Sequence, residues 1–401
     1  MSTPTPSPSR SIWFATGAML LVQVAVSVSN IAIPVLAPVL NQEFQLGPQL
    51  AGMYTAIMYA SFAVGLFGAA ALIDRFGAAR VSQFCALGAA LGLVVGSTGT
   101  VVSIVLCAII MGIAAAPETP ASTQFLIASV PANQRSFIFS LKQTGKPLGT
   151  MAAALIIPLL VPFAGWRWTL IILALAGCGT ALMMEPVRRR NPRPRVTRPT
   201  NADGHGLLHR LTATARHAIQ LPGMARLTIV NLVFTSIQTC VSAFLVIALV
   251  DGLDYTLALA GTMLALVQVA GVFGRLAWGF VADRWQSPRR MLTWLSVGIV
   301  VTPVLLGLSE TSWPPALVAA LSIALGLTTN SWNGVIIADI ARLSPPDQAG
   351  ATLSGAMMYG VIGAITMPLL FGWAAATLGI GTAFMGIGAI GLIAFWALVR
   401  P

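Results

Sequence analysis

Four ionisable residues lie inside long apolar runs of this sequence, where charged side chains are rare: Glu118, Lys142, Lys146 and Arg275. A charged side chain inside a bilayer costs about 2.5–3.5 kcal/mol on insertion scales, so it usually faces a partner or water and marks a functional site. Arg275 precedes Asp283 by eight residues, which places it roughly 12 Å deeper along a helix. Its guanidinium is therefore predicted to bind the negative group of a ligand. A structural pairing with a carboxylate is the alternative.

Lys142 and Lys146 are one helical turn apart and share a helix face. Two like charges repel unless something negative lies between them. Lys146 is predicted near the middle of its helix, whereas Lys142 is closer to the end, where its amine could reach the interface. If their helix faces the helix of Arg275, the three side chains form a basic cluster, and this cluster predicts an anionic ligand.

Glu118 stands in the middle of another apolar run, between Pro117 and Pro120. If its helix and the helix of Lys146 form an antiparallel hairpin that turns near Asn133, the two side chains lie at similar depth and could form a structural ion pair. Alternatively, Glu118 takes up and releases a proton as burial and a neighbouring lysine change around it. The sequence leaves both interpretations open.

Uncharged polar side chains form two stripes at i, i+4, i+7 spacing, each on one face of a predicted helix. One stripe holds Gln23, Ser27 and Asn30, and the other holds Asn231, Thr235 and Gln238. A polar stripe in lipid needs a partner or water, so the two stripes predict an aqueous cavity between two halves of the chain. Interhelical packing is the alternative for Tyr359. The expected substrate-binding residues of this cavity, besides the basic cluster, are Asn30, Asn231, Gln238, Asn330, Asn333 and Tyr359.

Long apolar helices must position these residues. The 401 residues are 57% hydrophobic and 8% charged, whereas soluble proteins carry about 25% charged residues. The apolar runs lack alternating polarity, which excludes a β-barrel and predicts an all-α membrane protein. Gly88, Gly92 and Gly96 predict close helix packing. Twelve spans are predicted, at 12–40, 49–73, 81–98, 101–129, 136–163, 166–184, 221–249, 256–281, 291–308, 314–341, 350–376 and 379–399.

Basic residues fall almost entirely in alternate links between these spans. Cytoplasmic loops carry an excess of Lys and Arg, so we expect cytoplasmic N- and C-termini. From the length, the short loops and the absence of targeting signals we expect a multi-pass protein of the bacterial inner membrane. The chain then reads as a disordered cytoplasmic tail (1–11), a six-helix bundle (12–184), a basic cytoplasmic loop (185–220) and a second six-helix bundle (221–401).

Other functional classes lack the residues that they need. The sequence contains no nucleophile–base set, phosphate loop or cluster of metal ligands, so we expect no enzyme activity, no metal and no cofactor. The net charge of +11 comes from short links and one loop, a pattern that marks topology and not nucleic-acid binding. The expected partners are a small anionic molecule, protons and the lipid bilayer, and the expected state is a monomer.

A short motif occurs twice, at Leu72-Ile73-Asp74-Arg75-Phe76-Gly77 and at Val281-Ala282-Asp283-Arg284. These copies follow predicted spans 2 and 8, and the chain thereby resembles the major facilitator superfamily, whose loop between helices 2 and 3 reads G-x-L-x-D-R-x-G-R-R. The resemblance implies two pseudo-symmetric six-helix bundles, a site near the midplane and alternating access by rocking. It also implies conformational latches at Asp74, Arg75, Asp283 and Arg284, with a fixed structural contact as the alternative.

The resemblance also orders the functional hypotheses. Oxalate/formate antiporters and monocarboxylate permeases of this superfamily carry an arginine on helix 8 that contacts a substrate carboxylate, and Arg275 resembles it. The first hypothesis is therefore proton-coupled symport of a small organic anion. The segment from Gly145 to Gly149 resembles the helix 5 signature G-x-x-x-G-P-x-x-G-G of drug/proton antiporters, with Lys146 and Thr150 in place of two glycines. Drug/proton antiport is the alternative, and a transporter-like receptor is a third reading.

Overall fold

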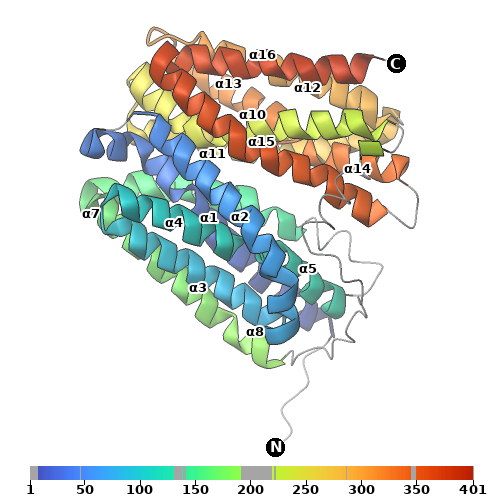
Figure 1. The fold of residues 1–401 in the computed structure, drawn as a ribbon. Coiled ribbons are helices and arrows are strands. Elements are labelled where there is room, and N and C mark those ends of the chain that lie inside the picture. The colour runs from blue at the N-terminus through green and yellow to red at the C-terminus, as the bar shows by residue number, and fades with distance from the viewer. Residues whose placement is uncertain are drawn as a thin grey trace, which may run out of the picture. The chain divides into compact units, whose positions relative to one another are not determined.

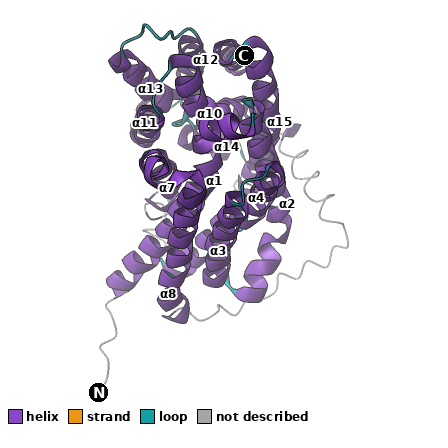
Figure 2. Cartoon of the chain, turned by 90° about the vertical axis from the view of Figure 1, so that its left-hand side faces the viewer, coloured by secondary structure: helices purple, strands orange, loops and turns teal. Residues whose placement is uncertain are grey.

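The computed structural model describes residues 8–45, 47–130, 138, 141–190, 219–220, 223–285, 287–344 and 349–400. All regular elements in these ranges are α-helices (Figure 1, Figure 2). Eleven helices are long and apolar enough to cross a membrane, and one of them, Leu141–Arg189, covers two predicted spans. Within it, α7 (Gly145–Met183) is interrupted by Gly165, whose φ of 70° and ψ of 166° are not helical. With that helix counted for two spans, the described helices correspond to the twelve predicted spans, of which 136–163 and 221–249 begin outside the described residues. The all-α membrane fold is confirmed.

The first compact unit comprises Met1–Ala32, Ala60–Ala153 and Leu160–Asn201. It holds the first part of α1 (Pro8–Phe44), the second part of α2 (Gln49–Phe76), α3 (Ala78–Ser97), α4 (Val101–Ala115), α5 (Glu118–Ser129), most of α7, and α8 (Glu185–Arg190). Glycines of α3 let α4 approach, because a β-carbon at Gly88, Gly92 or Gly96 would touch Ala114, Met111 or Cys107. These contacts confirm the close packing predicted from the glycine spacing.

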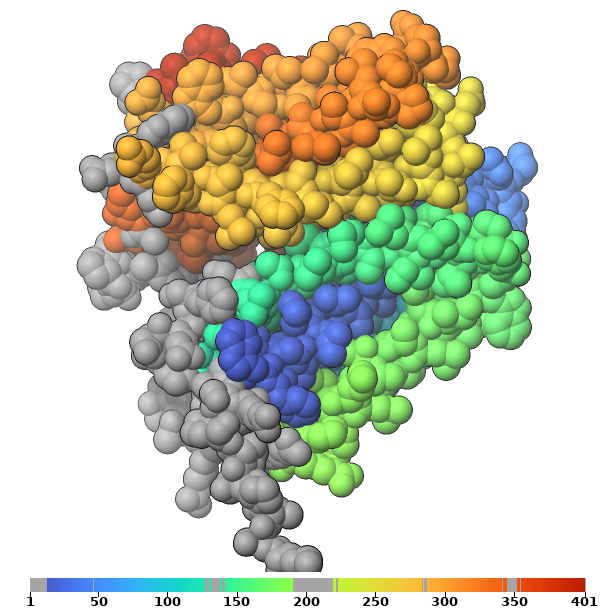
Figure 3. Space-filling model, turned by 180° about the vertical axis from the view of Figure 1, so that it is seen from behind, coloured from blue at the N-terminus to red at the C-terminus, as the bar shows by residue number. Residues whose placement is uncertain are grey.

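The second compact unit comprises Ile33–Tyr59, Ala154–Leu159 and Ala202–Pro401. Its helices are α10 (Met224–Leu253), α11 (Leu257–Trp285), α12 (Pro288–Gly307), α13 (Pro315–Thr329), α14 (Asn333–Leu343), α15 (Ala349–Leu378) and α16 (Ile380–Val399). In this unit α12 packs along α16, and α10 packs along α15 (Figure 1). The helices α11, α12 and α13 also pack against one another, and their yellow and orange surfaces adjoin in Figure 3.

Helix starts are set by local side chains. Thr100 caps α4 by accepting a hydrogen bond of 3.0 Å from the Ser103 amide, and the Ser103 hydroxyl accepts one of 3.0 Å from the Thr100 amide. Ser287 caps α12 in a similar way, with Pro288 at the first helical position. Both arrangements satisfy amide groups that a helix start would otherwise leave without partners.

Two predicted spans are each broken into two helices. The span 101–129 contains α4 and α5, and the span 314–341 contains α13 and α14. Pro117 has no amide hydrogen to continue the first span. At the second break, Ser331 Oγ donates to the Gly326 carbonyl at 2.8 Å and Thr329 Oγ1 donates to the Leu325 carbonyl at 2.7 Å. Such hydroxyl contacts compete with regular helical bonds. Each of the two predicted spans nevertheless corresponds to one candidate membrane span, Val101–Leu126 and Pro315–Ile340.

Two glycines bring segments of both predicted bundles into the second unit. A β-carbon at Gly52 of α2 would collide with the carbonyl oxygen of Pro368 on α15, and one at Gly261 of α11 would collide with that of Ala154 on α7. Residues 33–59 and 154–159 therefore group with the C-terminal helices. The predicted bundles divide the chain at 185–220 instead, and that division stays a prediction.

Candidate functional site

A buried ion pair lies at the break between α4 and α5. Lys142 Nζ is 2.9 Å from Glu118 Oε1 and donates a hydrogen bond of 3.1 Å to Oε2. The two side chains are only 3% and 5% exposed. Thr119 Oγ1 also donates to Glu118 Oε2 at 3.0 Å. Glu118 is the first residue of α5, where the helix dipole stabilises negative charge, so three features hold this carboxylate in place.

The roles predicted for the two lysines change accordingly. Glu118 pairs with Lys142 and not with Lys146, and Lys142 is buried and does not reach an interface. Lys146 is exposed, and none of the ion pairs among the described residues includes it. The sequence estimate assumed two uninterrupted helices. The break at Pro117 and the turn at Thr144 change the register between them, so depth counted along the sequence is wrong here.

The polar stripe of α1 packs against α7. A β-carbon at Gly145 would lie 3.0 Å from Gln23 Oε1, and one at Gly149 would lie 2.6 Å from the Ser27 β-carbon. Gln23 Nε2 also donates a hydrogen bond of 3.1 Å to Gln143 Oε1. The two glycines that resemble the helix 5 signature of drug antiporters therefore serve close packing between α1 and α7.

Arg275 reaches the second helix break from neighbouring α11. Its Nε donates a hydrogen bond of 2.9 Å to the carbonyl oxygen of Asn330, which lies where α13 has ended and α14 has not begun. The Arg275 side chain is half-buried, and no ion pair in the described ranges includes it. Its two terminal amino groups have no hydrogen-bond partner among the described residues. A guanidinium carries five donors in a planar fork, so most of its capacity is unused.

Two neighbours of Arg275 on α11 were missed by the sequence reasoning. Gln268 Oε1 accepts a hydrogen bond of 3.2 Å from Asn330 Nδ2, and Trp278 Nε1 donates one of 2.6 Å to the Leu327 carbonyl. The spacing of Gln268, Arg275 and Trp278 places them on one helix face. That shared face is the signal from which they could have been found.

The other polar candidates differ in what they contact. Asn231 is 1% exposed, and its Nδ2 donates a hydrogen bond of 3.0 Å to the Ala356 carbonyl. This contact ties α10 to α15 and satisfies one donor of a buried amide, and the substrate contact of Asn231 stays a prediction. Asn330 is also buried, and its hydrogen bonds to Arg275 and Gln268 are those given above. The remaining candidates are half-buried, and their substrate contacts stay predictions: Asn30, Gln238, Asn333 and Tyr359.

Residues 18–354 and 227–401 match the family model of the Major Facilitator Superfamily. The chain belongs to this superfamily. Two proteins from strains of Mycobacterium tuberculosis, each an uncharacterized MFS-type transporter, are 24% identical to it over 262 residues. The matched segment is 64% of this chain and 55% of theirs, so the chain spans about half the length of these curated relatives.

Solved structures of several transporters share the fold. A bacterial homologue of the human lysosomal transporter Spinster, inward-facing and unoccupied, has a TM-score of 0.81 at 15% identity over 99% of this chain and 97% of its own. The nucleoside transporter NupG has a TM-score of 0.76 at 13% identity, over 97% and 98%. A D-xylose-proton symporter has a TM-score of 0.74 at 16% identity, over 98% of each chain. Superfamily members are transporters and not enzymes.

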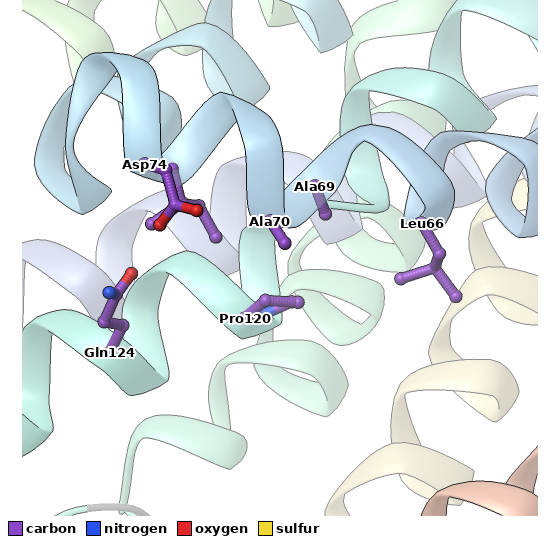
Figure 4. A pocket seen from close by; sticks show the side chains of 7 residues that line it. Leu66, Ala69, Ala70, Asp74, Pro120 and Gln124 are labelled. Atoms are coloured by element: carbon purple, nitrogen blue, oxygen red, sulfur yellow. The ribbon is translucent and has the colours of Figure 1, made fainter. Parts of the chain in front are cut away.

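The loop motif of this superfamily member lies beside a pocket in the first unit. The pocket has a volume of about 360 Å³ between α2 and α5 and is lined by Leu66, Ala69, Ala70, Ile73, Asp74, Pro120 and Gln124 (Figure 4). Asp74 and Gln124 lie at the same end of it, and Leu66 lies at the other. Arg75 and Arg284 are exposed, whereas the side chain of Asp283 lies outside the described residues. The latch role of the four motif residues stays a prediction.

Proposed function

We propose that this superfamily member is a proton-coupled secondary transporter that carries a small organic anion, most simply a carboxylate, by alternating access. The observation that carries the proposal is Arg275. It is a half-buried arginine in a helix long and apolar enough to span a membrane, and it has no carboxylate partner among the described residues. An uncompensated guanidinium is costly in a membrane, and a carboxylate satisfies it with two parallel hydrogen bonds.

Lys146 supports the same ligand chemistry. It is exposed in the first unit and belongs to no ion pair in the part of the chain that the structure describes. Lys146 lies in a helix long and apolar enough to span a membrane. An ammonium group that faced lipid there would be costly, so we infer that it faces water. Lys142 is already compensated by Glu118. Lys146 in the first unit and Arg275 in the second are thus each a positive charge that attracts an anion and repels a cationic drug.

Glu118 is the candidate for proton coupling. Its carboxylate holds the buried Lys142 amine, and protonation would remove that ion pair and leave a buried charge without its partner. A proton taken up at Glu118 would therefore change the energetics of the contact between α5 and the segment 141–143, which precedes α7. A purely structural ion pair is the alternative, and it predicts that neutralising both residues leaves coupling intact.

Thermal unfolding of the purified full-length protein tests the anion proposal. The compounds are acetate, lactate, benzoate and oxalate, with glucose and tetraphenylphosphonium for comparison. A ligand at about 100 times its Kd stabilises the folded state by about 2.7 kcal/mol. We expect at least one carboxylate to stabilise the wild type and the control Arg400→Ala, whose side chain is exposed, but not Arg275→Ala.

Two outcomes would contradict the proposal. Equal stabilisation of Arg275→Ala by the carboxylate would show that the anion binds elsewhere. Stabilisation by tetraphenylphosphonium alone would favour drug/proton antiport, because a site built on the uncompensated charge of Arg275 should repel this cation.

A further inference from the structure

We infer that Gln268 is a positioning residue that, through Asn330, fixes the guanidinium of Arg275 so that only its two terminal amino groups face a ligand. The inference rests on the proposed anion site and adds how that site recognises a carboxylate. Gln268 and Arg275 both lie on α11, two helical turns apart, and Asn330 lies at the break between α13 and α14.

The first step concerns the edges of the guanidinium. A carboxylate can form two parallel hydrogen bonds either with Nε and one terminal nitrogen or with the two terminal nitrogens. Nε of Arg275 already donates to the Asn330 carbonyl at 2.9 Å, which removes the first possibility. The second edge has no partner among the described residues. A carboxylate is therefore expected to approach end-on, along the axis of the side chain.

The second step concerns what fixes the Asn330 carbonyl. Asn330 has φ −107° and ψ 1° and follows the last residue of α13. A carbonyl inside a helix is oriented by its helical hydrogen bond, whereas the Asn330 carbonyl lies beyond the helix end and is oriented by tertiary contacts. Its side chain is 3% exposed, and Nδ2 donates to Gln268 Oε1 at 3.2 Å. Gly271 allows this approach, because a β-carbon there would lie 2.7 Å from the Asn330 β-carbon.

The third step concerns the orientation of the two amides. Asn330 Oδ1 is buried and has no hydrogen-bond partner. Rotating both amide groups exchanges their oxygen and nitrogen atoms, and Gln268 Nε2 would then donate to Asn330 Oδ1. The side chains remain hydrogen-bonded in either orientation. Gln268 thus holds Asn330, and Asn330 holds Arg275, without any contact between Gln268 and the ligand.

The hydrogen bond of Arg275 Nε can be followed directly by NMR of the full-length protein labelled with ¹⁵N at arginine Nε. A proton on Nε exchanges slowly with water when it is bonded to a buried carbonyl, and Arg275→Lys identifies the signal by removing it. We compare the wild type with Gln268→Met, which keeps the shape and removes the amide, and with Gln268→Glu, which still pairs with Asn330. A hydrogen bond to a charged group contributes about 1.5–3 kcal/mol. Exchange should therefore be roughly ten to a hundred times faster in Gln268→Met and near the wild-type rate in Gln268→Glu.

Fast exchange at Arg275 in the wild type, or unchanged exchange in Gln268→Met, would overturn the positioning role. The other arginine signals report whether each variant is folded. Binding of acetate, lactate, benzoate and oxalate is then measured for the same three proteins. A Kd raised about tenfold in Gln268→Met and restored in Gln268→Glu is expected, and an unchanged Kd would contradict the inference. If none of the four binds the wild type while Arg275 Nε stays protected, the anion site is wrong and the hydrogen-bonded positioning of Arg275 stands.

Discussion

A double-mutant cycle on the buried pair, with Glu118→Gln and Lys142→Met, separates the two roles considered for Glu118. At a separation of 2.9 Å and an effective dielectric constant near 20, two unit charges attract by about 6 kcal/mol. Removing one partner of a buried pair leaves the other uncompensated and costs about 3–5 kcal/mol. Replacing both with uncharged groups of similar volume is often close to neutral. Each single variant should therefore be much less stable than the double variant, with a coupling energy of about 6 kcal/mol or more.

The assay is unfolding in mixed micelles, followed by the loss of helical signal. The matched control is Arg189→Met. Arg189 Nε is 2.9 Å from Glu185 Oε1, but the two side chains are 75% and 29% exposed, so water screens their interaction and the unfolding midpoint should hardly move. Additive effects of Glu118→Gln and Lys142→Met would refute the reasoning, because independent residues have no coupling energy.

The same variants in proteoliposomes address coupling. If Glu118 is only a structural partner, the double variant regains both stability and uptake of the carboxylate driven by a pH gradient. If Glu118 carries the proton, the double variant regains stability and still exchanges labelled for unlabelled carboxylate, but it no longer accumulates the carboxylate in response to the gradient. Accumulation at the wild-type level would refute coupling through Glu118.

Two further predictions concern packing and exposure. Gly52→Ala and Gly261→Ala should each lower the unfolding free energy by about 1–3 kcal/mol, because the added methyl group collides with a backbone carbonyl. The control Gly386→Ala meets nothing within 4 Å and should leave the unfolding free energy unchanged or raise it by up to about 1 kcal/mol. Equal unfolding midpoints for all three variants would contradict the close contacts. Lys142 and Lys146 are the only lysines of the chain, so mass spectrometry can follow their reaction with an amine-reactive reagent separately. The reagent should modify Lys146 and spare Lys142 as long as Glu118 is present. Early modification of Lys142 in the wild type would contradict its burial.

The helices could be predicted from the sequence because a bilayer restricts the choices. Long apolar runs with few charges and no alternating polarity form α-helices in lipid, because every backbone polar group must be satisfied within the segment. Small residues at helical spacing mark close contacts between helices, as they do along α3. The breaks at Pro117 and Asn330 could not be predicted in the same way. A proline inside an apolar run only kinks many membrane helices. The second break depends on hydroxyl groups of Thr329 and Ser331 that could equally bond within a regular helix.

A residue of the candidate site could be predicted only where its own type and position were unusual. Arg275 stands out in any apolar run because of its cost in lipid. Choosing Lys142 over Lys146 as the partner of Glu118 required the register of two interrupted helices, and one turn of error exchanges the two lysines. Gln268 shares a helix face with Arg275, which could have drawn attention to it, but its role follows only from its hydrogen bond to Asn330, which the sequence does not show.

The internal repeat of the sequence explains why contacts between helices were easier to predict than the partners of the charged residues. The same residue offset that relates Asp74 to Asp283 also relates Gly52 to Gly261. Each glycine of the second pair lets its helix approach the carbonyl of a helix from the other predicted bundle. Close helix contacts of this kind depend on small residues, and a repeated scaffold repeats them. Both positions are therefore set by the repeat and not by a ligand.

The charges do not follow the repeat. The offset that relates Gly52 to Gly261 pairs Arg275 with Leu66, which lines the pocket between α2 and α5. Glu118 and Asn333 are each the first residue after a helix break, so the breaks recur while the carboxylate occurs only once. A proton neutralises a carboxylate, whereas an anion neutralises a cation, so proton uptake and anion binding need different groups. Under the proposed function, placing Glu118 in one repeat and Arg275 in the other lets each bind its own ion, and only movement of the shared scaffold links them.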